Sequence, residues 1–315
     1  MCAENKTAVT ELELLGFGHL QNFNSLLFVF FITVYIITLT GNMLIIALII
    51  VNPRLHTPMY FFLCNLSCCE IFFTTNIVPF MLYVIWNESG TMPFTGCITQ
   101  FYFYTSSGSI ECLLLTVMSL DRYLAICIPL RYSSIMNVRL RNHLAIWSWS
   151  LGFLVMLIIP ITLSFLQFCD SNIIDHIFCD ISPILQLSST NTSVIEKEAF
   201  VIAVALCILP FLFIIGSYFC IFLTIARIPS DTGRQKTFST CSSHLASVCA
   251  YFGTLFTIYL VPSQSRSIQI NKILSLIYIA VTPLFNPVIY SLRNKDIKMC
   301  LLSFIVFKKA GKQFN

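Results

Sequence analysis

The stretch LLFVFFITVYIITLTGNMLIIALIIV, residues 26–51, contains no charged side chain. A helix of this length spans about 39 Å at 1.5 Å per residue, which exceeds the roughly 30 Å hydrocarbon core of a bilayer. Lipid offers no water to the polar groups of the backbone, so a segment that crosses it must bond them internally, as a helix does. The stretch therefore predicts a transmembrane helix.

Six more apolar stretches of roughly 20 residues or more follow this one. They cover residues 58–85, 97–125, 140–166, 198–225, 238–261 and 272–292. An outer-membrane barrel would instead show alternating segments of about 10 residues. The pattern predicts an all-α membrane protein, a seven-transmembrane helix bundle.

The overall composition agrees with a chain that is mostly surrounded by lipid. Hydrophobic residues make up 57% of the 315 positions and charged residues 10%, whereas soluble domains carry about 25% charged residues. Mean hydropathy is +0.83. These values argue against a soluble enzyme or a nucleic-acid-binding protein. They indicate that the lipid bilayer is a partner of the chain.

The basic residues predict how the bundle is oriented, because Lys and Arg concentrate on the cytoplasmic side of membrane proteins. Fourteen of the eighteen lie at one end of the predicted spans: Arg54, Arg122, Arg131, Arg139, Arg141, Arg227, Arg234, Lys236, Arg293, Lys295, Lys298, Lys308, Lys309 and Lys312. We therefore expect an extracellular N-terminus (1–25), a receptor domain of seven spans (26–292) and a cytoplasmic tail with a short amphipathic helix (293–315). Residues 1–25 lack the long apolar run of a cleavable signal peptide, so we expect the first span to act as an uncleaved signal anchor.

Three Asn-x-Ser/Thr sequons fall on the predicted outer side. They begin at Asn5, Asn87 and Asn191, and we expect them to be glycosylated. A fourth, at Asn65, lies within the second span, where we expect no modification.

Seven short motifs occur in order along the chain. They are GN at 41–42, LHTPMYFFL at 55–63, MSLDRYLAIC at 118–127, PLRY at 129–132, SY at 217–218, KTFSTCSSHL at 236–245 and PLFNPVIYSLRN at 283–294. Each resembles the signature of odorant receptors, a branch of the rhodopsin-like G protein-coupled receptors, at its expected place. The resemblance covers the chain from the first span to the tail.

This resemblance implies that the chain binds a ligand within the bundle and signals to a heterotrimeric G protein of the stimulatory, olfactory type. The coupling and activation residues that it implies are Asp121, Arg122, Tyr123, Tyr218, His244, Asn286, Pro287 and Tyr290. Physically, Asp121 can pair with Arg122 at the inner end of the third span, and Pro287 interrupts the hydrogen-bond ladder of the seventh. A plain interfacial arginine, reaching toward the headgroups, is the alternative for Arg122.

Two acids, Glu70 and Glu111, lie inside predicted spans. They are 12 and 11 residues from the inner ends of their helices, which places both about 17 to 18 Å deep. Acids at that depth are usually paired or functional. The resemblance implies a sodium site, and a hydrogen-bonded pair that shares a proton is the alternative; both remain open.

The fourteen cysteines do not form a disulfide framework, because nine of them lie in or at the ends of spans and act there as small apolar residues. The resemblance implies a disulfide between Cys97 and Cys179 on the oxidising side. Its usual second loop pair lacks a partner here, since Ser189 stands where a cysteine is expected. We therefore expect Cys169 to be unpaired.

The third span presents small and hydroxyl-bearing side chains at i, i+1, i+4 and i+5, which share one helix face. With the positions that the resemblance adds, the predicted ligand contacts are Tyr104, Thr105, Gly108, Ser109, Ile202, Leu206, Phe252, Leu255, Tyr259, Leu276 and Ile279. Such a lining has no fixed charge and suits a small, neutral, volatile organic molecule with about one hydrogen-bonding group. The alternative is that these residues only pack helix against helix.

Other classes have little support. No phosphate-binding loop, zinc-protease motif or nucleophile elbow occurs, which argues against an enzyme, and no repeated pore loop indicates a channel. We expect no cofactor apart from the sodium ion considered above. A rhodopsin-like receptor for another small lipophilic ligand, with the same fold, is the serious alternative.

Overall fold

The computed structural model describes residues 9–17, 23–169, 171–259, 268–293 and 297–301. Its long helices are α1 (Asn24–Val51), α2 (Pro58–Asn87), α3 (Phe94–Cys127), α5 (Val138–Met156), α8 (Ser193–Ala203), α9 (Leu209–Ala226), α10 (Asp231–Tyr259) and α11 (Ile268–Arg293). Short helices and turns are η2 (Pro53–Leu55), η3 (Pro129–Arg131), α4 (Tyr132–Ile135), α6 (Ile158–Leu163), α7 (Ile181–Gln186) and the π-helical turn η4 (Val204–Ile208). The strands are β1 (Glu11–Leu15), β2 (Ser89–Pro93) and β3 (Ile173–Ile174).

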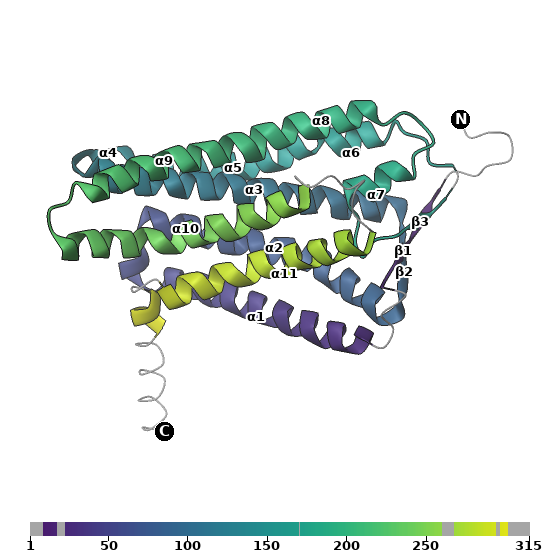
Figure 1. Cartoon of the computed structure of the whole chain (residues 1–315), viewed down its shortest axis with the longest axis horizontal. Helices are drawn as coiled ribbons and strands as arrows, with labels where there is room; N and C mark the ends of the chain where they lie inside the picture. The colour runs from purple at the N-terminus through teal and green to yellow at the C-terminus, as the bar shows by residue number, and fades with distance from the viewer. Residues whose placement is uncertain (1–8, 18–22, 170, 260–267, 294–296, 302–315) are drawn as a thin grey trace, which may run out of the picture.

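Seven long helical runs lie side by side in the described part of the chain, with α5–α6 and α8–η4–α9 each forming one run (Figure 1). The helix α3 packs against α2, α5 and α9, and α1 against α2 and α11. Large apolar side chains such as Leu26, Leu154 and Phe219 are exposed on the outer faces, as expected of surfaces that meet lipid tails. The predicted all-α, seven-helix membrane fold is confirmed.

Not all seven runs are equally apolar. Among the described residues, five are long and apolar enough to cross a membrane by length and composition, or six if α3 is taken with the bent short helices that follow it. The run that falls short is α10, which begins at Asp231, seven residues before the predicted start of that span. Beyond its charged first turns, polar side chains such as Ser243, His244 and Thr254 lower its hydropathy. Residues 260–267, where that span was predicted to end, lie outside the described residues.

Prolines account for two irregularities that the sequence analysis did not predict. The fourth span divides at Leu157 into α5 and α6, because the ring of Pro160 clashes with the carbonyl of Met156 four residues earlier. In the fifth, Pro210 offers no N–H to the carbonyl of Leu206, and the preceding turn loosens into η4. A π turn inserts one residue, so it changes which side chains face inward.

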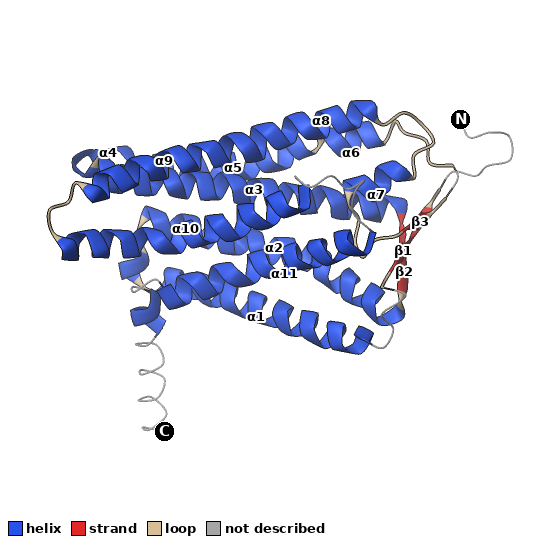
Figure 2. Cartoon of the chain, in the orientation of Figure 1, coloured by secondary structure: helices blue, strands red, loops and turns tan. Residues whose placement is uncertain are grey.

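A small sheet, also unpredicted, covers one end of the bundle (Figure 2). Its order is β2-β1-β3, with β1 antiparallel to β2 and parallel to β3. Leu12 and Leu14 of β1 are fully buried beneath it. The N-terminal segment, the loop between α2 and α3 and the long loop between α6 and α8 (called the second loop below) therefore form one cap over the helices.

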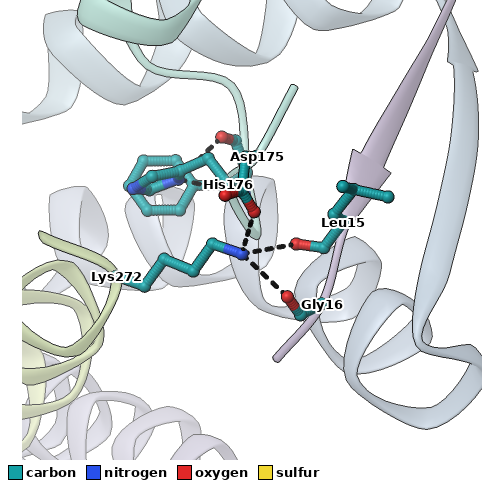
Figure 3. Close-up of polar contacts among 6 residues, drawn as sticks. Leu15, Gly16, Asp175, His176 and Lys272 are labelled. Carbon is teal, nitrogen blue, oxygen red and sulfur yellow. Dashed lines mark hydrogen bonds and ion pairs between the residues drawn. The ribbon is translucent and has the colours of Figure 1, made fainter. Parts of the chain in front are cut away.

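Lys272, near the start of α11, holds this cap to the bundle (Figure 3). Its ammonium donates to the carbonyl oxygens of Leu15 at 3.2 Å and Gly16 at 2.7 Å, and it pairs with the carboxylate of Asp175. The side chain is 1% exposed. A buried ammonium needs this full set of acceptors, so one side chain joins the N-terminal segment, the second loop and α11.

His176 adds a second contact between the loop and α11. Its Nδ1 lies 3.0 Å from the carbonyl oxygen of Phe178, and its Nε2 lies 3.3 Å from the hydroxyl of Ser275. Burial lowers the pKa of His176 to about 4. The ring is therefore neutral at physiological pH, and the positive charge at this contact belongs to Lys272.

We predict that Lys272→Met loosens the cap. The variant keeps the apolar stem but leaves Asp175 and two carbonyls without their donor. We expect the free energy of unfolding to fall by about 2 to 4 kcal/mol. This figure is below the cost of breaking a fully buried ion pair, because water reaches the partly exposed Asp175. Thermal unfolding of the purified receptor should shift down by several degrees. Lys197→Met on the exposed face of α8 is the matched control, and equal unfolding temperatures for the two variants would contradict the assigned role of Lys272.

Candidate ligand cavity and coupling site

A cavity of about 280 Å³ lies at the capped end of the bundle. Its walls come from α3, the α5–α6 run, α8, η4, α10 and α11, and its roof includes Asp180 and Ile181 of the second loop. The wall is mostly apolar and aromatic. This is the composition of small-molecule sites, at the low end of their usual range of volumes.

The structure brings six of the predicted ligand contacts together on this wall: Tyr104, Thr105, Gly108, Ser109, Ile202 and Leu255. Four others are buried away from the cavity, in helix packing: Leu206, Phe252, Leu276 and Ile279. Phe252, for example, packs on Phe211 with ring centroids 4.8 Å apart. The side chain of Tyr259 lies outside the described residues.

The π turn explains why Leu206 is not part of the lining. With one extra residue in the turn, Cys207 and Ile208 face the cavity, and a regular helical spacing could not reveal this shift. The sequence analysis also missed Phe101, Met156, Ile159, Asp180, Ile181, Ala199, Phe200, Ala203, Tyr251, Phe256 and Tyr278. Of these, Tyr251 and Tyr278 were within reach of a helical-face argument, but the α5–α6 residues and the loop residues carried no such signal.

Asp180 corrects the expectation of a lining without fixed charge. The residue is half-buried at the cavity roof, directly after Cys179, whose disulfide to Cys97 fixes the loop on α3. The backbone N–H of Cys179 also donates to Oε1 of Gln100 on α3 at 3.0 Å. Burial raises the pKa of Asp180 to about 6, so its carboxyl is largely ionised at neutral pH.

The disulfide implied by the resemblance, Cys97–Cys179, is present. The expectation that Cys169 is unpaired is wrong, because Cys169 is also disulfide-bonded. Of the three predicted glycosylation positions, Asn87 and Asn191 have exposed side chains, whereas Asn5 lies outside the described residues. Asn65 accepts a hydrogen bond from Trp149 within the bundle.

The two intramembrane acids meet deeper in the bundle than the cavity. The amide nitrogen of Asn286 donates to Glu70 and, at 3.3 Å, to Glu111. The amide of Asn42 lies 3.5 Å from the second oxygen of Glu70. All four side chains are at most 4% exposed, so α1, α2, α3 and α11 share one buried polar cluster.

At the opposite end from the cap, Arg122 pairs with its neighbour. Its Nε donates to Oδ2 of Asp121 at 3.0 Å, and the hydroxyl of Tyr132 in α4 donates to Oδ1 at 2.8 Å. Asp121 is fully buried and the Arg122 side chain is 13% exposed. The carboxylate thus holds the guanidinium against α3.

A second contact joins α9 to α10 and α3. The hydroxyl of Tyr218 lies 2.7 Å from Nδ1 of His244, and Nε2 of His244 lies 3.1 Å from the carbonyl oxygen of Leu115. His244 is fully buried. This chain of contacts links α3, α9 and α10.

The remaining predicted coupling residues lie on α3 and α11. Tyr123 is half-buried beside Arg122. Pro287 of α11 lies so close to α1 that a Cβ added at Gly41 would be 2.9 Å from the Cβ of Pro287. The absence of a side chain at Gly41 therefore allows α1 and α11 to come into contact. The side chain of Tyr290 lies outside the described residues, so its predicted part in coupling stays a prediction.

Comparisons with known proteins agree with this arrangement. The olfactory receptor family model matches residues 31–308. Olfactory receptor 11L1 of Homo sapiens is 44% identical over 295 residues, covering 94% of this chain and 92% of that protein. Olfactory receptor 5G9 of Mus musculus is 44% identical over 301 residues, covering 96% of each.

Among solved structures, squid rhodopsin has the same fold. The TM-score is 0.71 at 17% sequence identity, covering 91% of this chain and 86% of rhodopsin. The family model spans nearly all of the helical bundle, and the relatives match it from end to end. The chain therefore belongs to the olfactory receptor family.

Proposed function

We propose that this receptor binds small, neutral, volatile organic molecules in the cavity and activates a stimulatory G protein of the olfactory type, which raises cyclic AMP. Membership of the family makes the chain a multi-pass plasma membrane receptor rather than an enzyme. The cavity carries the proposal for the ligand: at about 280 Å³ it suits a molecule smaller than most drugs and excludes a peptide. Few contacts fit in that volume, so affinity should be modest.

The proposal for coupling rests on Arg122. In the described state Asp121 and Tyr132 hold its guanidinium within the bundle. An agonist that binds better to a state in which this group is released shifts the population toward that state. The released guanidinium, with the basic side chains of the inner loops, would then meet the G protein on the cytoplasmic side, which the distribution of Lys and Arg assigns to this end.

A receptor for another small lipophilic ligand would have the same fold and the same inner contacts. An odorant panel read out as cyclic AMP in cells that express the receptor distinguishes the two. A response to volatile neutral molecules supports the proposal, whereas a best agonist that is a peptide or a non-volatile lipid contradicts it.

We predict opposite effects for two substitutions at the inner end. Arg122→Ala should reach the surface and lose at least about tenfold in agonist-evoked cyclic AMP, because it lacks the group that contacts the G protein. Tyr132→Phe should raise basal cyclic AMP, because Asp121 loses the hydrogen bond that steadies it. Lys197→Ala, exposed on α8 at the capped end, is the control; an Arg122→Ala response equal to this control would refute the coupling role.

We further propose that the cluster of Glu70, Glu111 and Asn286 holds a sodium ion in the inactive state. Two carboxyl groups that share one amide supply the oxygens that such an ion needs. A shared proton is the alternative occupant.

The two occupants predict different responses to sodium. If the ion binds, replacing external sodium by N-methylglucamine at constant ionic strength should raise agonist potency in the parent and leave Glu111→Gln unchanged. A parent receptor whose potency is the same with and without sodium would favour the shared proton.

A further inference from the structure

We propose that the cavity selects ligands that donate a hydrogen bond, that the carboxylate of Asp180 accepts it, and that small alcohols and phenols are the preferred class. The inference rests on the proposed function for the existence of a ligand, and it adds which polar group that ligand carries. It follows from where the hydrogen-bonding protons and lone pairs of the wall are directed.

Three of the five hydroxyl groups on the wall have already used their protons. Thr105 donates to the carbonyl of Phe101 at 2.9 Å, and Ser109 to that of Thr105 at 3.0 Å. Tyr251 donates to the carbonyl of Gly108 at 2.7 Å. A hydroxyl has one proton and two lone pairs, so each of these groups can offer the cavity an acceptor. Tyr104 and Tyr278, the other two, pack their rings against Phe73 at centroid distances of 5.7 Å.

Asp180 adds the strongest acceptor. Its Oδ1 accepts from the backbone N–H of Ile181 at 2.8 Å and caps α7. Within the described part of the chain, no Lys, Arg or His forms an ion pair with it. Lys272, the ammonium that holds the cap, is occupied by Asp175 and two carbonyls. The carboxyl therefore has acceptor capacity left, and none of the described basic residues pairs with it.

An ionised acceptor at the roof of an apolar cavity discriminates strongly. A ligand hydroxyl can donate to it, and charge-assisted hydrogen bonds are the stronger kind. A ketone or an ether of the same shape has no proton to donate to Asp180, so it leaves the carboxylate without this hydrogen bond. Sites that hydrogen-bond a ligand group reject analogues that lack it, so we expect at least about a tenfold difference in potency between an alcohol and its ketone.

A protonated amine also donates, but it fits this cavity less well. An ammonium brings three N–H donors and no acceptor, and its full charge must leave water. The cavity has one carboxylate, while the rest of the wall is mostly apolar. A single hydroxyl matches one strong acceptor, which is why the proposal commits to alcohols and phenols.

The test uses matched ligands on the full-length receptor. Sets such as 2-octanol, 2-octanone and 2-aminooctane, and cyclooctanol with cyclooctanone, are compared by thermal stabilisation of the purified receptor and by cyclic AMP in cells. We expect the alcohols to stabilise and activate at concentrations at least about tenfold lower than their ketones. Ketones or amines that equal or exceed the alcohols, or a panel in which no member stabilises the receptor, would overturn the inference.

Asp180→Asn separates the carboxylate from the shape of the site. Asn also caps helices well, so the fold should hold, while the new amide can donate to a carbonyl. The alcohol-to-ketone potency ratio should fall to about one or invert. Glu196→Gln, an exposed acid on α8 that does not line the cavity, should keep the parent ratio, and an unchanged ratio in Asp180→Asn would overturn the role of Asp180. If alcohols stabilise the purified receptor but raise no cyclic AMP, the coupling proposal fails and this inference stands.

Discussion

The whole structure depends on one constraint, that lipid satisfies no hydrogen bond. A polar group within the bundle is stabilised only by a partner in the protein, and several buried polar groups gather in a few separate clusters. Asp121 takes Arg122 and Tyr132 at one end, and Asn286 joins two acids in the middle. These clusters lie where helices meet, so they can also hold one arrangement of the bundle against another.

The same constraint determined how much of the fold could be predicted. Apolar length alone indicated seven helices, and their approximate bounds were close, because a span must cross the bilayer whatever its neighbours are. The breaks were missed, since a proline such as Pro160 or Pro210 permits either a kink or a divided helix and the packing decides which. The cap was missed too: β1 is one short strand, and its pairing with two distant loops leaves no local pattern.

Helical periodicity predicted the lining residues of the cavity where the helix is regular. The face of α3 with Tyr104 and Ser109 lines the cavity, because α3 is regular there. Leu206 does not line the cavity, because the π turn brings Cys207 to the wall in its place. Asp180 and Lys272 gave no signal as a pocket acceptor and a buried clamp, since acids and lysines near helix ends are ordinarily solvated. Loop residues acquire such roles from tertiary contacts and disulfides, as the link from Cys179 to Cys97 illustrates.

Filling the cavity with a larger side chain tests most directly whether the cavity is the site at which agonists bind and activate the receptor. A Cβ added at Gly108 would lie 3.4 Å from the hydroxyl of Tyr278 and 3.6 Å from that of Tyr251. These are ordinary contact distances, so a larger side chain fits there and occupies volume that a ligand would otherwise fill. We expect Gly108→Val to keep its surface level and basal cyclic AMP and to lose at least about tenfold in agonist potency. A concentration–response curve that superimposes on that of the parent receptor would contradict the account.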